Sequence, residues 1–135
     1  MWACPVCGRK FRNTSQAHSC FRSNPEDFFK GKPPQLLAAY RKLAAEVAKL
    51  GEVRVDGVKN GIMIKARTTF LAVKAKKDRI DLEFLLETAH GDPPVYKTVQ
   101  AWESRVAHFA AVESPEDITP VLIALLRRAY TLSAG

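Results

Sequence analysis

Four side chains near the start of the chain have the types and the spacing of metal ligands. Cys4, Cys7, His18 and Cys20 form the pattern C-x2-C-x10-H-x-C. Two cysteines separated by two residues can present both thiolates to one ion, and side chains two apart in extended backbone leave the same side of the chain. Three sulfurs and one imidazole form the closed tetrahedral shell that is typical of structural zinc. We therefore predict that these residues bind a structural Zn²⁺.

The cysteines have two competing interpretations. A thioredoxin-like redox motif requires a βαβ context, and the residues around Cys4 do not show that pattern. Free thiols are the other interpretation, although the predicted zinc site uses every cysteine in the chain. A segment of about twenty residues buries too little apolar area to fold alone, and a bound metal commonly supplies the missing free energy. The predicted role of the zinc is therefore to fold this segment.

Basic and aromatic residues alternate around the predicted metal site. Cations beside aromatic rings are typical of surfaces that bind single-stranded nucleic acid, where rings stack on bases and cations neutralise phosphates. The alternative is that the cations form only the solvated face of a small zinc module. The residues concerned are Arg9, Lys10, Phe11, Arg12 and Arg22.

Positive charge is concentrated in the first part of the chain. The 135 residues carry a formal net charge of +7. Residues 1–80 contain 17 Lys and Arg against 6 Asp and Glu, whereas residues 81–135 contain 4 against 8. This asymmetry indicates either a face that binds a polyanion or two halves that meet as ion pairs.

The composition indicates a globular protein, with 47% hydrophobic and 26% charged residues. No run of about 18 apolar residues occurs, and the N-terminus has cysteines and polar residues where a signal peptide has its apolar stretch. Three cysteines cannot all pair, and thiolate–metal chemistry is typical of a reducing compartment. We expect a soluble cytoplasmic protein.

The sequence predicts two units joined by a stiff segment. Residues 1–31 form the predicted zinc-binding module, which ends in a short helical turn capped by Asn24. Lys32-Pro33-Pro34 marks the joint, and residues 32–135 form the second unit. This unit begins with an amphipathic helix over Pro34–Leu50, where apolar side chains recur every three or four residues.

Alternating apolar residues then predict an antiparallel sheet of about five to six strands. Asn60-Gly61 is a strong two-residue turn signal, and pairing across it sets Val55 opposite Ala66. The same register places Lys59 opposite Ile62 on the nominal core side. A lysine at that position either snorkels at the sheet edge or guards a pocket.

A second hairpin has Lys77-Asp78 as its predicted turn. That register pairs Val73 with Leu82 on one face and Lys74 with Asp81 on the other. Opposite charges that face each other across strands account for part of the basic and acidic runs.

Two more strands, over residues 95–101 and 105–112, precede a final helix. The helix begins either at Ser114, with Pro120 as a kink, or with Thr119 as N-cap and Pro120 at the first helical position. The order helix, antiparallel meander, helix indicates an α+β fold.

Several segments, in this order, resemble a bacterial family of small proteins that pairs a short zinc-ribbon-like segment with a domain of unknown function. They are CPVCGRKF, SQAHSC, FFKGKPP, KARTTFLAVKAKKDRIDLEFLL, RVAHFAAVESPEDI and LLRRAY. The resemblance covers nearly the whole chain. It implies the helix, sheet, helix architecture and a structural zinc on Cys4, Cys7, His18 and Cys20, and it implies no activity.

Catalytic motifs are not evident, and the sequence leans away from an enzyme. Gly-rich phosphate loops, a G-x-S-x-G elbow and an H-E-x-x-H pair are missing. No nucleophile–base set can be assigned, because neighbours on one strand alternate faces. The candidate acid–base residues are Glu83, Glu87, His90, Asp92 and His108.

His108 shares strand parity with Val106 and Ala110, which predicts an imidazole on the apolar face. A hydrogen-bonded core histidine is the favoured interpretation over a pocket residue.

Three functional hypotheses follow from these patterns. The leading one is a non-enzymatic, zinc-stabilised protein that binds nucleic acid through its basic first half. The second is a protein-interaction module, in which the zinc segment or FFKGKPP docks on a partner and the zinc is purely structural. The third is a small-ligand pocket near Lys59 and His108.

Overall fold

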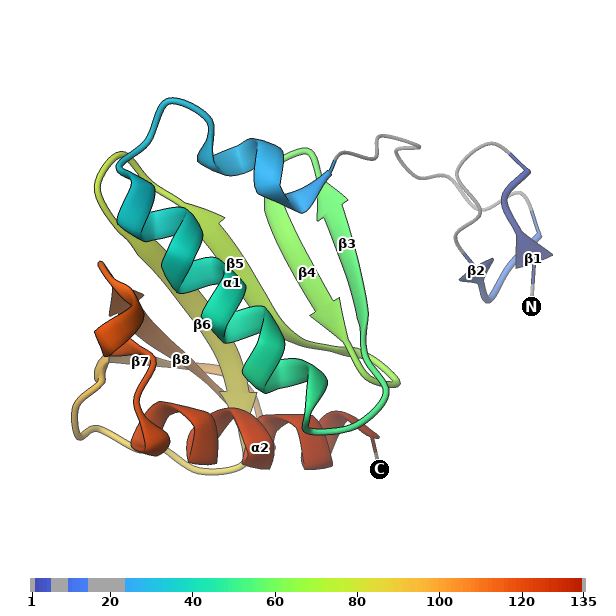
Figure 1. The fold of residues 1–135 in the computed structure, drawn as a ribbon. Helices are drawn as coiled ribbons and strands as arrows, with labels where there is room; N and C mark the ends of the chain where they lie inside the picture. Colours follow the sequence, from blue (N-terminus) through green and yellow to red (C-terminus); the bar gives the residue numbers. More distant parts are fainter. Residues whose placement is uncertain (1, 6–9, 15–23, 135) are drawn as a thin grey trace.

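The computed structural model describes residues 2–5, 10–14 and 24–134 (Figure 1). Most of this part is an α+β domain with two helices and a six-stranded antiparallel sheet, which confirms the predicted class. The helices are α1 (Pro34–Ala48) and α2 (Pro120–Ala134), and two short 3₁₀ helices are η1 (Pro25–Phe29) and η2 (Pro115–Asp117). The strands are β3 (Arg54–Val58), β4 (Gly61–Lys65), β5 (Thr69–Ala75), β6 (Ile80–Leu86), β7 (Val95–Trp102) and β8 (Arg105–Val112).

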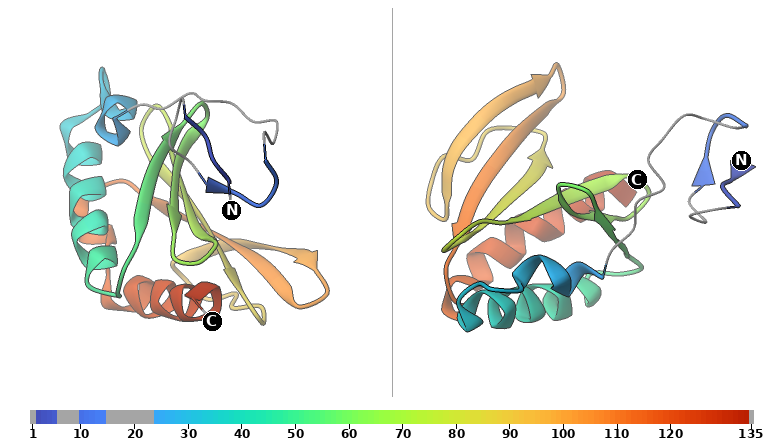
Figure 2. Two further views of the ribbon diagram at one scale, coloured as in Figure 1. Left: turned by 90° about the vertical axis from the view of Figure 1, so that its right-hand side faces the viewer. Right: turned by 90° about the horizontal axis from the view of Figure 1, so that it is seen from above.

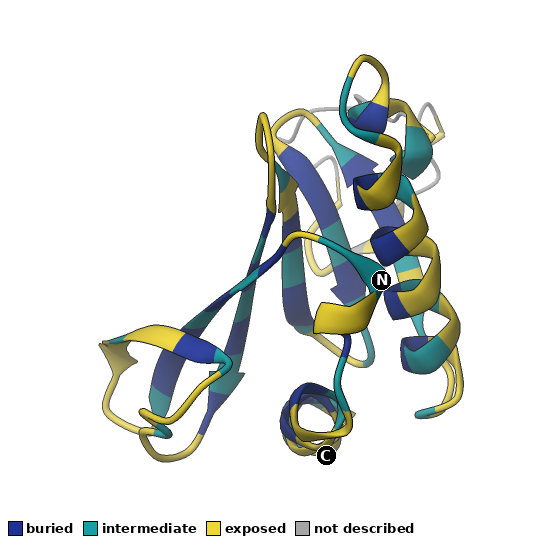
Figure 3. Cartoon of the chain, turned by 60° about the vertical axis from the view of Figure 1, so that its left-hand side comes forward, coloured by how far each residue is buried: buried dark blue, intermediate teal, exposed yellow. Residues whose placement is uncertain are grey.

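One face of the sheet is covered by both helices, and the other face is not (Figure 2). Because successive side chains on a strand point to opposite faces, each cross-strand row belongs to one side. One row on the helix-covered side is Val55, Ile64, Leu71, Phe84, His108 and Thr98. Its members on β4, β5, β6 and β8 are fully buried. Figure 3 shows that buried residues, in dark blue, are frequent along the strands of the sheet.

The amphipathic pattern of α1 forms the other half of this core. Leu36, Leu43 and Val47 are at most 1% exposed and pack in the same cluster as the sheet. The 3₁₀ helix η1 joins them, because Phe29 is buried and stacks on Tyr40 with ring centroids 5.1 Å apart. The predicted helix over Pro34–Leu50 is therefore present, with its observed end at Ala48.

The first hairpin has a different turn from the predicted one. Val58 pairs with Gly61 and Val55 with Ile64, so the turn is Lys59-Asn60 and not Asn60-Gly61. The observed register differs by two residues, which leaves every side chain on the expected face. Lys59 is therefore an exposed turn residue and does not lie opposite Ile62.

The reason for the shift is the place that Gly61 takes in the sheet. A Cβ at Gly61 would lie 2.7 Å from the Val73 carbonyl oxygen, and its φ of 156° is one that other residues rarely adopt. The absence of a side chain at Gly61 allows β4 and β5 to approach closely at this point, whereas the sequence pattern predicted a turn residue.

The second hairpin has the predicted register. Val73 pairs with Leu82 and Lys74 with Asp81. Its turn is tightened by a hydrogen bond of 2.8 Å from the Lys76 N–H to the Arg79 carbonyl.

The order of the last two strands departs from the predicted meander. The sheet runs β3-β4-β5-β6-β8-β7, so β8 lies between β6 and β7. The residues explain this order, because β8 contributes Val106, Ala110 and Val112 to the buried side while most of β7 is exposed. Strand β7 takes the edge, where two register shifts interrupt its pairing with β8.

The last helix follows the second of the two predicted starts. Thr119 caps it, since its Oγ1 accepts a hydrogen bond of 3.2 Å from the Leu122 N–H, and Pro120 is the first helical residue. The Ser114 signal forms the separate 3₁₀ helix η2 with a capping box. Among the described residues, neither helix has the length and apolar character needed to cross a membrane.

Gly61→Ala should destabilise the domain by about 1 to 3 kcal/mol, because the added methyl group meets the backbone of β5 and the φ becomes strained. Gly91→Ala is the matched control, since a Cβ there has nothing within 4 Å. Urea unfolding of both variants measures the difference. Equal midpoints for the two variants would show that the close approach does not constrain β4.

Candidate functional site

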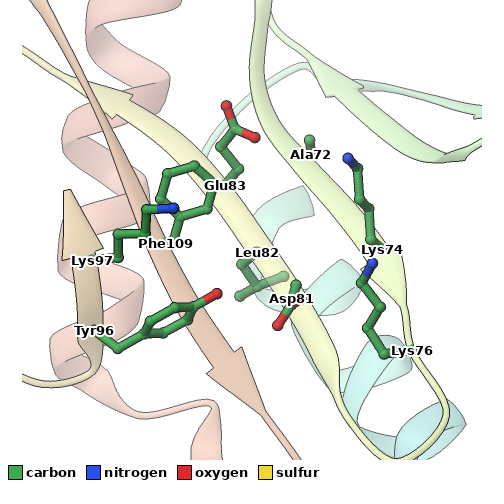
Figure 4. A pocket seen from close by; sticks show the side chains of 9 residues that line it. All are labelled: Ala72, Lys74, Lys76, Asp81, Leu82, Glu83, Tyr96, Lys97 and Phe109. Carbon is green, nitrogen blue, oxygen red and sulfur yellow. The ribbon is translucent and has the colours of Figure 1, made fainter. Parts of the chain in front are cut away.

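The uncovered face of the sheet carries a mixed row of charged and apolar residues next to the buried row. This row is Asp56, Met63, Ala72, Glu83, Phe109 and Lys97, and it crosses all six strands. Over β5, β6, β8 and β7 the face is hollowed by a pocket of about 220 Å³. Figure 4 shows the lining residues, which are Ala72, Lys74, Lys76, Asp81, Leu82, Glu83, Tyr96, Lys97 and Phe109.

Three lysines and two aromatic rings give this pocket its character. Tyr96 is 53% exposed, and it lies at the first register shift of β7, between Val95 and Lys97. The Lys97 Nζ lies 5.3 Å from the centroid of the Phe109 ring, which is a cation–π contact. Lys74 and Lys76 approach from β5 and its turn on the opposite side of the pocket.

The carboxylate that faces Lys74 is engaged elsewhere. Asp81 lies directly opposite Lys74, but its Oδ1 is 3.0 Å from the Arg79 Nε. Within the described ranges, Lys74, Lys76 and Lys97 have no carboxylate at ion-pair distance. The backbone pairing of Lys74 with Asp81 is therefore as predicted, but Asp81 forms its ion pair with Arg79, two residues earlier in the chain.

This arrangement can bind an anion next to a flat ring. Ammonium groups neutralise phosphate or carboxylate, and exposed aromatic rings offer a stacking surface. Glu83, on the floor of the pocket, can accept a hydrogen bond from an amino group.

The N-terminal candidates are only partly described. Strand β1 (Trp2–Ala3) pairs antiparallel with β2 (Lys10–Phe11), with Trp2 opposite Phe11 and Ala3 opposite Lys10. Cys4 follows β1 and is 5% exposed. Lys10 and Arg12 are exposed, and Phe11 lies in β2 opposite Trp2.

The other N-terminal candidates lie outside the described residues. They are the predicted ligands Cys7, His18 and Cys20 and the predicted surface cations Arg9 and Arg22. Among the residues that are described, no three metal-ligating side chains gather at one point.

His108 is buried on the helix-covered side of the sheet, as its strand parity predicts, and is 0% exposed. Its Nε2 accepts a hydrogen bond of 2.9 Å from the His90 backbone N–H. Its Nδ1 therefore carries the proton, which it donates over 2.9 Å to the Val106 carbonyl. The ring also stacks on Phe84 with centroids 5.5 Å apart.

Burial lowers the pKa of His108, and the positive field of His90 and Arg128 adds to this effect. The hydrogen bond to Val106 acts in the opposite direction but is the smaller influence. The ring is thus a neutral structural group that ties β8 to the loop before β7.

Lys59 and His108 lie far apart in the sheet. Lys59 is in the turn after β3, and three strands separate β3 from β8. The remaining acid–base candidates are spread out as well. Glu83 lines the pocket of about 220 Å³ on the uncovered face, which we call the open-face pocket, whereas Glu87 and Asp92 are exposed and lie outside it.

A family described as Domain of unknown function (DUF5655) matches residues 25–133. The chain belongs to this family. The chain matches no curated protein and no solved structure. The DUF5655 domain thus contains the whole six-stranded sheet, α1 and all but the last residue of α2, and its match begins at the first residue of η1. That helix also contacts α1 through an ion pair of 2.8 Å between Glu26 and Arg41.

Sequence reasoning missed three residues of the open-face pocket of the DUF5655 domain. Tyr96, Lys97 and Phe109 lie on strands whose order was predicted differently, so their proximity to Lys74 was hidden. A usable signal was present in VYKTVQAW, where two aromatic residues and a lysine occur in a strand with little apolar alternation.

The free energy of unfolding should fall as the pH drops from 7.5 toward 5. Because the pKa of His108 is lowered in the folded state, the unfolded chain binds the proton first, and protonation below about pH 6.5 favours unfolding. Urea titrations at several pH values measure this slope.

The slope should shrink strongly in His108→Gln. It should be reduced only slightly in His90→Gln, which removes one of the smaller influences on the pKa of His108 and keeps the backbone hydrogen bond to it. An unchanged slope in His108→Gln would assign the pH dependence to other groups.

Proposed function

We propose that this protein is a non-enzymatic binding protein for single-stranded nucleic acid, and that the open face of the sheet is its contact surface. The observation that carries the proposal is the set of three lysines without carboxylate partners in the described part of the chain, placed around Tyr96 and Phe109. Single-strand binding surfaces combine these two elements, a cationic track for the backbone and rings for the bases.

The geometry of the pocket supports one nucleotide at its centre. A base stacked on Tyr96 would have Lys97 on one side and Lys74 and Lys76 on the other, as partners for the flanking phosphates. Stacking of one base on one ring contributes about 1 to 3 kcal/mol and tolerates any base. The excess of cations in residues 1–80 adds a long-range attraction for the strand.

The N-terminal segment is proposed to bind one structural Zn²⁺ through Cys4, Cys7, His18 and Cys20. Two observations support this proposal. Strands β1 and β2 pair with each other, and Cys4, which directly follows β1, is buried. A zinc with four protein ligands supplies folding energy and leaves no open position for chemistry.

The surface of this segment would extend the binding track. Lys10 and Arg12 are exposed, and Arg9, Phe11 and Arg22 complete the proposed set of basic and aromatic residues.

Alanine at Lys74, Lys76 and Lys97 together should weaken binding of a labelled ten-nucleotide single-stranded DNA. The slope of log K against log salt should decrease by up to about 2, because each lost phosphate contact removes about 0.7. Tyr96→Ala should reduce the binding free energy by about 1 to 3 kcal/mol. Fluorescence anisotropy over a range of salt concentrations measures both effects.

The matched control is the triple alanine variant at Lys42, Lys49 and Lys59, which are also exposed but lie outside the pocket. Undetectable binding of the wild-type chain, or equal losses in the two triple variants, would contradict the proposed surface.

Metal analysis of the purified chain should give one zinc per molecule. Cys4→Ser and His18→Ala should each lose the metal, since removal of one ligand opens the tetrahedral shell. His90→Ala is the control histidine variant and should retain it. Retention of the full zinc content by His18→Ala would contradict the proposal that His18 is one of the four ligands.

A further inference from the structure

A second hollow lies where α2 passes the beginning of β8. It has a volume of about 590 Å³ and is lined by Glu87, Arg105, Arg127, Arg128, Thr131 and Leu132. The open-face proposal does not involve this part of the domain, because the two hollows share no lining residue.

The hollow concentrates positive charge, with three arginines beside one carboxylate, Glu87. Residues 81–135 contain only four cations against eight acids, and three of the four are the arginines of this hollow. In the described part of the chain, Arg105, Arg127 and Arg128 have no carboxylate at ion-pair distance. Arg105 is also oriented, because its Nη1 donates a hydrogen bond of 2.8 Å to the Ser104 carbonyl.

The field of this cluster reaches the interior of the domain. Arg128 is one of the charges that lower the pKa of the buried His108. Its positive charge is therefore felt within the protein, even though Glu87 lines the same hollow.

An apolar cleft adjoins the arginine hollow and shares Arg105 and Leu132 with it. The cleft has a volume of about 340 Å³ and lies between the C-terminal half of α2 and the tip of the β7–β8 hairpin. Trp102 stands at its rim and is 54% exposed, although it is one of the largest apolar side chains of the domain. The other apolar lining residues are Phe70, Leu85, Ala129 and Leu132.

The kind of ligand follows from these two neighbouring surfaces. Guanidinium groups bind carboxylates in a bidentate geometry, and a cleft lined by aliphatic carbons accepts one apolar side chain. Small ligands are normally enclosed over most of their surface, whereas Trp102, Arg127 and Arg128 are exposed, which fits an extended chain.

We propose that the arginine hollow and the apolar cleft together form a docking site for an acidic peptide segment of a partner protein. Carboxylates of the segment bind Arg105, Arg127 and Arg128, and one apolar side chain packs beside Trp102. The occupant is a short motif with acids on both sides of a large apolar residue. This site is independent of the open face of the sheet.

The test uses four labelled octapeptides in which acids flank one central Leu, Phe, Trp or Val, with the full-length chain and fluorescence anisotropy. At least one peptide should bind, and replacement of its central residue by Ser should weaken binding at least fivefold. Trp102→Ala should cause a similar loss. The double variant Arg127→Glu with Arg128→Glu should abolish binding.

The control variant carries Lys59→Glu and Lys77→Glu, which changes the net charge equally at two exposed turn residues. It should bind the peptides within twofold of the wild type. The Arg127→Lys with Arg128→Lys variant keeps the charge and the fold, and it should still weaken binding because the bidentate geometry is lost.

Three results would overturn the proposal. One is that none of the four peptides binds to the wild-type chain. Another is that the charge-matched control loses as much affinity as the arginine variant. The third is that the arginine variant binds the peptides normally but no longer binds the ten-nucleotide DNA, which would assign the hollow to nucleic acid.

Discussion

The burial of one side of the sheet under α1 and α2 determines the register of the strands and, through it, the residues that face the open side. Phe84 and His108 face each other on that side, and both are inaccessible to solvent. Successive side chains on a strand point to opposite faces. Each buried row therefore determines which residues form the adjacent row on the open face. The position of Glu83 and Phe109 is thus a direct consequence of the core, and a register slip of one residue would exchange the two surfaces.

The sequence predicted those parts of the fold in which two local signals agree. In the second hairpin, both the apolar alternation and the opposite charges of Lys74 and Asp81 require the same register. In the first hairpin the turn signal of Asn60-Gly61 competed with a packing requirement at Gly61, and packing between β4 and β5 decided the register. The position of β8 could not be predicted locally, since it depends on which of two strands buries more apolar area.

The candidate sites were predicted less completely than the fold. Tyr96, Lys97 and Phe109 meet Lys74 only because β8 lies between β6 and β7, and no spacing along the chain encodes that order. The three arginines of residues 81–135 were likewise visible as charges but not as a group. The proposed zinc ligands are the reverse case. Their spacing along the chain carries the prediction, and only Cys4 of the four lies in the described part of the chain.

The two edges of the sheet have a consequence for how binding surfaces can form. On one edge β3 is short and bears charged residues, and on the other β7 is interrupted by two register shifts. Both features discourage the backbone of another chain from adding as a further strand. Recognition by this domain would then depend on side chains, so that substitutions on one face can change what is bound without disturbing the hydrogen-bonded ladder beneath.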